Sequence, residues 1–155
     1  MGGAVSLALA AVFLAACTQQ PAPDESPVPT APTPSMSASA TPTPTPVLLP
    51  EGSADDNLPY FTLVTQQVWG GGERMAGRAY IDALVSAGFD KSRMQVTKDQ
   101  TAIGNAVDSI QFSVAWNEEC LIGQAGAVFP EPVTVILPAL QGGACLIGDT
   151  RPIDW

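Results

Sequence analysis

The chain has 155 residues, with 15 Pro, 14 Gly, 3 Cys and no His, and its 15 acidic and 6 basic side chains give a formal net charge of -9. A sequence without His excludes Ser-His-Asp and Cys-His catalysis, zinc sites with an imidazole ligand and imidazole pH switches. An acidic chain with so few bases neutralises phosphates poorly, so we expect no nucleic acid partner.

An uncharged apolar run at residues 2–16 precedes Cys17. The run is short for a bilayer span, and small residues at its end are typical of an export signal. Residues 14–17 (LAAC) resemble the lipobox of bacterial lipoproteins, in which the Cys thiol receives diacylglycerol and becomes the N-terminus after cleavage. We therefore predict a signal peptide over residues 1–16, lipidation of Cys17 and anchoring at the outer face of the cytoplasmic membrane. The run departs from an ordinary signal because the first basic residue is Arg74.

Residues 17–50 combine the predicted anchor Cys with a segment rich in Pro, Thr and Ser, which includes the repeat TPTPTP at 41–46. Proline removes backbone donors and restricts φ, so we expect a disordered, extended tether that builds no core, at roughly 3.1 Å per residue. Recognition by a proline-reading domain and O-glycosylation are the alternatives to a plain spacer.

The remaining residues, 51–155, suffice for one small globular domain. Apolar residues at helical spacing predict a helix from about Asp55 to the glycines at 70–72, and a second helix over residues 73–87. Alternating patterns then predict three strands. Residues 133–140 are apolar but interrupted by Pro138, so we predict a short helix there. Residues 144–147 are predicted to form a last strand. The expected strands lie at 94–97, 110–116 and 119–128, the last two joined by a turn at 117–118. The sum is an α+β fold, two N-terminal helices followed by a small, mostly antiparallel sheet.

Once Cys17 is assigned to lipid, Cys120 and Cys145 remain, an even number in an exported domain, and we predict that they form a disulfide. Each begins the tetrapeptide CLIG, and equivalent positions on two neighbouring strands would place the sulfurs in register. A redox pair is the alternative, but it would usually come with a Cys-x-x-Cys motif, which the sequence lacks.

Carboxylates are the only plentiful catalytic groups, and no pattern of them predicts a catalytic residue. Glu118 and Glu119 are adjacent, so on a strand they would point to opposite sides rather than into one cleft. The acidic groups at 55–57 and 108–109 lack the spacing of a calcium loop, and the glycines at 70–72 lack the Lys-Ser/Thr of a phosphate loop. We therefore expect no metal and no cofactor.

Aromatic side chains could line a sugar or peptide groove, although core and edge packing is the simpler interpretation. The candidates are Tyr60, Trp69, Tyr80, Trp116 and Trp155. The ring and α-carboxylate of Trp155 are further expected to pack back on the sheet near Arg151 as a structural clasp.

Six short sequence motifs are spread over the folded part: DNLP at 56–59, IDAL at 81–84, AGFDK at 87–91, DSIQFSV at 108–114, CLIG at 120–123 and TRPIDW at 150–155. This set resembles an uncharacterised domain family of actinobacterial lipoproteins. The resemblance implies a cell-envelope lipoprotein of a high-GC Gram-positive bacterium, and it brings no activity with it.

Anchor, spacer and disulfide-bonded domain together favour a non-enzymatic module that binds a wall component, a peptide or another envelope protein. The alternative is a carboxylate-dependent hydrolase of wall polymers, which requires two converging acids in an aromatic-lined cleft. A purely structural spacer would have no concave site.

Overall fold

The computed structural model describes residues 44–155. The predicted signal peptide, Cys17 and the tether up to residue 43 lie outside the described residues. The elements follow in the order α1 (Ala54–Trp69), α2 (Gly77–Ser86), the 3-10 helix η1 (Lys91–Arg93), β1 (Met94–Val96), β2 (Ser109–Trp116), β3 (Glu119–Gly126) and β4 (Val133–Pro138).

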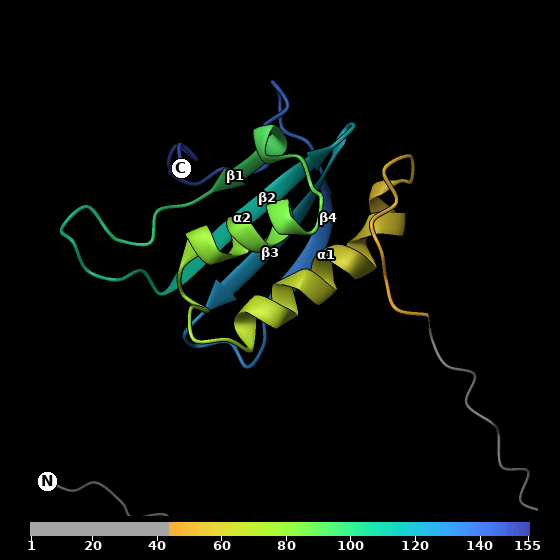
Figure 1. Cartoon of the computed structure of the whole chain (residues 1–155). Helices are drawn as coiled ribbons and strands as arrows, with labels where there is room; N and C mark the ends of the chain where they lie inside the picture. Colours follow the sequence, from red (N-terminus) through yellow and green to blue (C-terminus); the bar gives the residue numbers. More distant parts are fainter. Residues whose placement is uncertain (1–43) are drawn as a thin grey trace, which may run out of the picture. The chain divides into compact units, whose positions relative to one another are not determined.

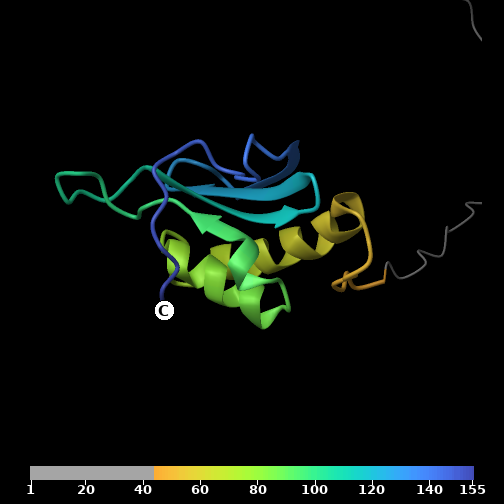
Figure 2. The same cartoon turned by 90° about the horizontal axis from the view of Figure 1, so that it is seen from above.

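The four strands form one antiparallel sheet in the order β1-β2-β3-β4 (Figure 1). Both α-helices cover the same face of the sheet: α1 contacts β3 and β4, and α2 contacts β1 and β2 (Figure 2). The predicted α+β fold of two helices followed by an antiparallel sheet is confirmed. Neither helix of the described part is long and apolar enough to cross a membrane.

The two helices begin for different reasons. A capping box starts α1: the Asp56 N–H donates to Ser53 Oγ at 3.1 Å, and the Ser53 N–H donates to Asp56 Oδ2 at 2.9 Å. The second helix starts at Gly77, not at Glu73 as predicted, because the Gly77 N–H donates to Asp99 Oδ1 at 2.9 Å. This cap comes from 22 residues further along the chain, where helical spacing gives no sign of it.

The core lies between the helices and the covered face of the sheet. The β2–β3 hairpin pairs from Ser109↔Gly126 to Trp116↔Glu119 around the expected turn, where Asn117 has a φ of 57°. Alternate strand residues point to the helices, and Phe112 lies opposite Gly123, whose missing side chain leaves room for the ring. The fully buried core side chains include Phe61, Tyr80, Ile81, Leu84, Val96, Ile110, Phe112, Val114 and Leu121.

Residues 133–138 form the edge strand β4, so the predicted short helix is wrong. The Ala139 N–H donates to the Glu118 carbonyl at 2.8 Å. In an antiparallel pair every second residue points its backbone N–H and C=O at the partner strand, so the backbone groups of Leu137 and Val135 also face β3. Pro138 then faces the free edge, where its missing N–H costs no ladder bond.

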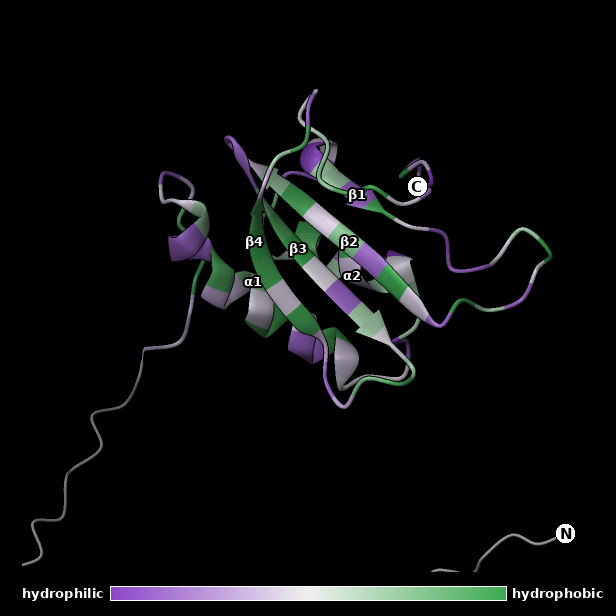
Figure 3. Ribbon diagram, turned by 180° about the vertical axis from the view of Figure 1, so that it is seen from behind, coloured by the Kyte–Doolittle hydropathy of each residue, from purple (hydrophilic) through white to green (hydrophobic). Residues whose placement is uncertain are grey.

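The predicted last strand at residues 144–147 is also wrong, although the disulfide prediction holds. Cys145 is bonded to Cys120 with a Cα–Cα distance of 5.6 Å. The segment has no strand partner; instead the N–H groups of Cys145 and Leu146 donate to Gln95 Oε1 at 2.6 and 3.2 Å. It therefore lies on the helix-free face of the sheet, shown in Figure 3, where apolar residues concentrate along β4.

Candidate functional site

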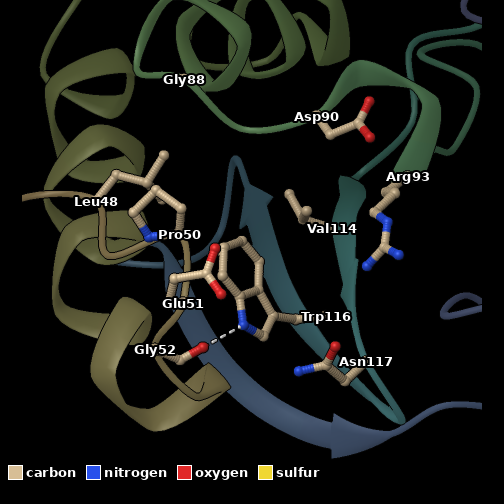
Figure 4. A pocket seen from close by; sticks show the side chains of 10 residues that line it. All are labelled: Leu48, Pro50, Glu51, Gly52, Gly88, Asp90, Arg93, Val114, Trp116 and Asn117. Carbon is tan, nitrogen blue, oxygen red and sulfur yellow. Dashed lines mark hydrogen bonds between the residues drawn. The ribbon is translucent and has the colours of Figure 1, made fainter.

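A pocket of about 330 Å³ opens where the chain before α1, the loop after α2 and the end of β2 meet (Figure 4). Its apolar and polar lining comes from segments far apart in the sequence. The lining residues are Leu48, Pro50, Glu51, Gly52, Gly88, Asp90, Arg93, Val114, Trp116 and Asn117.

Trp116 forms the aromatic part of the lining. Its Nε1–H donates to the Gly52 carbonyl at 2.8 Å, and its ring packs edge-to-face against Phe89 with centroids 6.1 Å apart. The indole is half-buried. Because its one donor is already used, Trp116 can present only its ring to a ligand.

The chain before α1 forms one wall, and Asn57 holds that chain in place. The buried Asn57 accepts the Leu49 N–H at its Oδ1 and donates from its Nδ2 to the Leu49 carbonyl, both at 2.8 Å. Leu48 packs against the core. The described chain thus contacts the folded part from Leu48 onward, before the expected boundary at Glu51, and this wall is ordered by hydrogen bonds rather than loosely apposed.

The exposed charges of the pocket are Glu51, Asp90 and Arg93. Asp90 caps η1: its Oδ1 accepts the Ser92 hydroxyl at 2.7 Å and the Ser92 N–H at 2.9 Å. These hydrogen bonds, foremost the one from the Ser92 side chain, hold the pKa of Asp90 below its ordinary value of 3.8. Asp90 is therefore an ionised acceptor at neutral pH, and the pocket carries charges of both signs.

The acidic and glycine motifs of the sequence lie elsewhere. Glu118 is exposed in the hairpin turn, and Glu119 begins β3. Asp56 belongs to the α1 cap, and the glycines at 70–72 are exposed beyond the end of that helix. Within residues 44–155 no group of three or more His, Cys, Asp or Glu side chains is placed to hold a metal ion.

Of the five aromatic candidates, Trp116 is the one that lines this pocket. Tyr80 is fully buried and stacks on Phe112 at 4.3 Å. The remaining three pack as follows: Tyr60 stacks on Phe89, Trp69 lies beneath Arg74, and Trp155 lies among Arg78, Lys91 and Arg151. Packing, the simpler interpretation, holds for these four.

Sequence reasoning missed the charged and amide groups of the pocket. Glu51 precedes α1, Asp90 caps η1, Arg93 is the last residue of η1, and Asn117 belongs to the β2–β3 turn. Each looks like a local capping or turn residue, and Asp90 and Asn117 have those roles as well. No spacing in the sequence indicates that the three segments meet.

A family model described as a domain of unknown function, DUF6993, matches residues 65–149, more than half of the chain. The chain belongs to this family. The predicted membership of a family without assigned activity is thereby confirmed. The DUF6993 match covers the end of α1, α2, the whole sheet and both disulfide cysteines. It includes Asp90, Arg93 and Trp116, whereas the pocket wall at 48–52 precedes it. No curated protein and no solved structure matches the chain.

Proposed function

We propose that the protein is a lipid-anchored module of the cell envelope that binds its ligand without transforming it, displayed outside the cytoplasmic membrane of a high-GC Gram-positive bacterium. The observation that carries the binding role is the pocket at Trp116, which combines an aromatic ring, an apolar wall and charges of both signs. Such a mixture of apolar lining and a few polar groups is the usual composition of a small-ligand site. The ligand is a wall component, a peptide or part of another envelope protein.

The sequence before the described residues supports the anchor. Lipidation of Cys17 with two or three acyl chains would hold the protein stably, at about 0.8 kcal/mol per buried CH₂. Residues 18–47, which precede the segment that Asn57 holds against the domain, contain nine prolines, and if fully extended they would reach about 90 Å. The module would then reach ligands in the wall while its chain stays attached to the membrane.

Replacing the predicted lipidation site tests the proposed anchoring to the membrane. We expect the Cys17→Ser variant to move from the membrane fraction to the soluble fraction, because it cannot form the thioether to diacylglycerol. Intact-mass spectra of the wild type should show a chain that begins at an acylated Cys17. A wild type without acyl groups, or a variant that stays with the membrane, would contradict the anchor.

Replacing the aromatic lining tests the binding role. The full chain in detergent micelles is mixed with a solubilised digest of the producing bacterium's wall, and bound species are detected by native mass spectrometry. We expect adducts with the wild type that disappear in Trp116→Ala. The matched control is Trp69→Ala, which removes an aromatic ring that does not line the pocket. Adducts absent from the wild type, or equal in both variants, would argue against binding here.

The second candidate is a carboxylate-dependent hydrolase of wall polymers, which is favoured by the presence of two carboxylates, Glu51 and Asp90, in one aromatic-lined pocket. Against it, the hydrogen bonds from Ser92 lower the pKa of Asp90, whereas a general acid needs a raised one. Turbidity clearing of purified walls decides: clearing that is lost in Glu51→Gln would establish the hydrolase and displace the non-enzymatic role.

A further inference from the structure

The charges of the pocket distinguish among the ligands that the proposed binding function allows. We propose that the pocket takes a zwitterionic ligand, the free end of an amino acid or short peptide that carries both an ammonium and a carboxylate group. This inference rests on the proposed binding function and names its substrate class.

The ammonium group fits Glu51, which lies across the ring of Trp116 from Arg93 (Figure 4). Asp90 belongs to the same turn as Arg93, whose N–H donates to the Asp90 carbonyl at 3.0 Å, so its carboxylate lies at the other end of the pocket. A cation beside the Glu51 carboxylate and an aromatic face gains both charge-assisted hydrogen bonds and cation–π attraction. A neutral or anionic group there would leave the Glu51 carboxylate uncompensated.

The carboxylate group fits Arg93. In the described part of the chain the ion pairs are Arg78–Asp82, Lys98–Asp149 and Arg151–Asp99, and Arg93 takes part in none of them. Its guanidinium presents a planar fork of donors that matches a carboxylate. Figure 4 shows Arg93 and Asn117 on one side of Trp116, with Pro50 and Glu51 on the other. The two ends of a zwitterion could therefore be bound across the indole.

The rest of the pocket limits the size and polarity of the ligand. Leu48, Pro50 and Val114 provide apolar surface, and the volume of about 330 Å³ is at the lower end for small-molecule sites. One or two amino-acid residues would fill it. A neutral sugar would find the ring of Trp116 but no indole donor, since Gly52 already accepts that N–H.

The test uses the full chain in detergent micelles and follows the indole N–H signal of Trp116 by two-dimensional NMR, with Trp116→Phe providing the assignment. The probes are the dipeptide Ala-Ala, its N-acetyl form, its C-terminal amide, free alanine and a trimer of N-acetylglucosamine. We expect Ala-Ala to bind, and capping either end to weaken binding by about tenfold or more. Comparing the affinity for free alanine with the affinity for Ala-Ala shows whether the ligand is a free amino acid or the end of a peptide.

Charge-neutralising variants assign each end of the ligand. Arg93→Gln should weaken Ala-Ala by about tenfold but leave its amide unchanged, and Glu51→Gln should weaken Ala-Ala but leave the N-acetyl form unchanged. Arg74→Gln and Glu118→Gln are the matched controls, because these exposed residues do not line the pocket. All four positions are exposed, and the dispersion of the NMR spectrum checks that each variant folds.

The outcomes separate this inference from the function on which it rests. Capped dipeptides that bind as tightly as Ala-Ala, or an Arg93→Gln variant that weakens Ala-Ala and its amide alike, would overturn the zwitterion. If the sugar trimer is the one probe that shifts the Trp116 signal, the proposed binding function is supported and the proposal of a zwitterionic ligand is overturned. If no probe shifts it, the zwitterion is overturned, while adducts with the wall digest would still support the module.

Discussion

Tyr80 is the largest side chain that the core buries completely, and its hydroxyl still reaches a partner. The ring stacks on Phe112, and the Oη–H donates to the Arg74 carbonyl at 2.9 Å. Burial raises the pKa of Tyr80 from 10.0 to about 12, because the phenolate would lie in an apolar environment. Arg74 opposes this rise by its positive charge.

This shift predicts a loss of stability in alkali. The pKa is higher in the folded state, so the stabilisation is fully present below pH 10 and is lost as pH rises toward 12. We expect the free energy of unfolding to fall by about 2 kcal/mol over that range, measured by urea denaturation. Tyr80→Phe should lose about 1 kcal/mol at pH 7, for the missing hydrogen bond, and should flatten the alkaline fall. An unchanged alkaline slope in this variant would refute the assignment.

At the scale of elements, the disulfide joins β3 to a segment that has no regular structure of its own. Residues 144–147 lie on the helix-free face through the Cys120–Cys145 bond and the two hydrogen bonds to the Gln95 side chain. Nearby, Val133, Val135 and Leu137 of β4 remain 38–49% exposed. The bond therefore positions a loop across the outer face of the sheet rather than pairing two strands.

Removing the bond should destabilise the domain and release this segment. For a sequence separation of 25 residues, chain entropy predicts a loss of about 3.5 kcal/mol in the Cys120→Ala/Cys145→Ala variant, measured by urea denaturation. Hydrogen exchange at the Cys145 (now Ala) and Leu146 amides should accelerate. Gln95→Leu is the matched control, which keeps the disulfide and removes the shared acceptor. Equal stability of wild type and double variant would contradict the entropic role.

At the scale of the whole domain, Trp155 connects the C-terminal segment to α2 and η1. The Trp155 ring lies 4.8 Å from the guanidinium carbon of Arg151, and its Nε1–H donates to Asp82 of α2 at 2.8 Å. Lys91 Nζ donates to the Trp155 carbonyl. The Arg151 N–H donates to the Val96 carbonyl at 2.9 Å, so the same tail also covers the outer edge of β1. The clasp near Arg151 is present, but the hydrogen bonds of Trp155 go to α2 and η1 and not to the sheet as expected.

Two substitutions at Trp155 separate its hydrogen bond from its ring. The bond from Trp155 is the main reason that the pKa of Asp82 lies below 3.8, so Trp155→Phe should raise that pKa while keeping an aromatic face near the cations. Trp155→Ala should also lose the ring contacts, at about 1–2 kcal/mol.

The Asp82 pKa is measured by NMR titration of its carboxylate. The lowered pKa stabilises the fold above pH 3.8 and less as pH falls through the folded value, so Trp155→Phe should weaken this acid dependence. An unmoved Asp82 pKa would show that the hydrogen bond has no influence.

The features that the sequence by itself determined are those with causes inside a few consecutive residues. The helical spacing from about Asp55 to the glycines at 70–72 and the alternation of 110–116 each follow from neighbours within about one turn or one strand. The disulfide followed from the two cysteines that remain once Cys17 is assigned to lipid, without knowledge of their surroundings. Such local patterns establish the α+β order because they need no distant partner.

The features that only the tertiary structure decided depend on groups far apart in the chain. Helix α2 begins at Gly77 because the Asp99 carboxylate accepts the Gly77 N–H. Residues 133–138 form a strand because they pair with the edge of β3, with Pro138 facing outward. The pocket likewise joins a wall before α1 to Trp116, held by one hydrogen bond across 64 residues. These arrangements depend on which surfaces meet when the chain folds, and neither propensity nor periodicity carries that information.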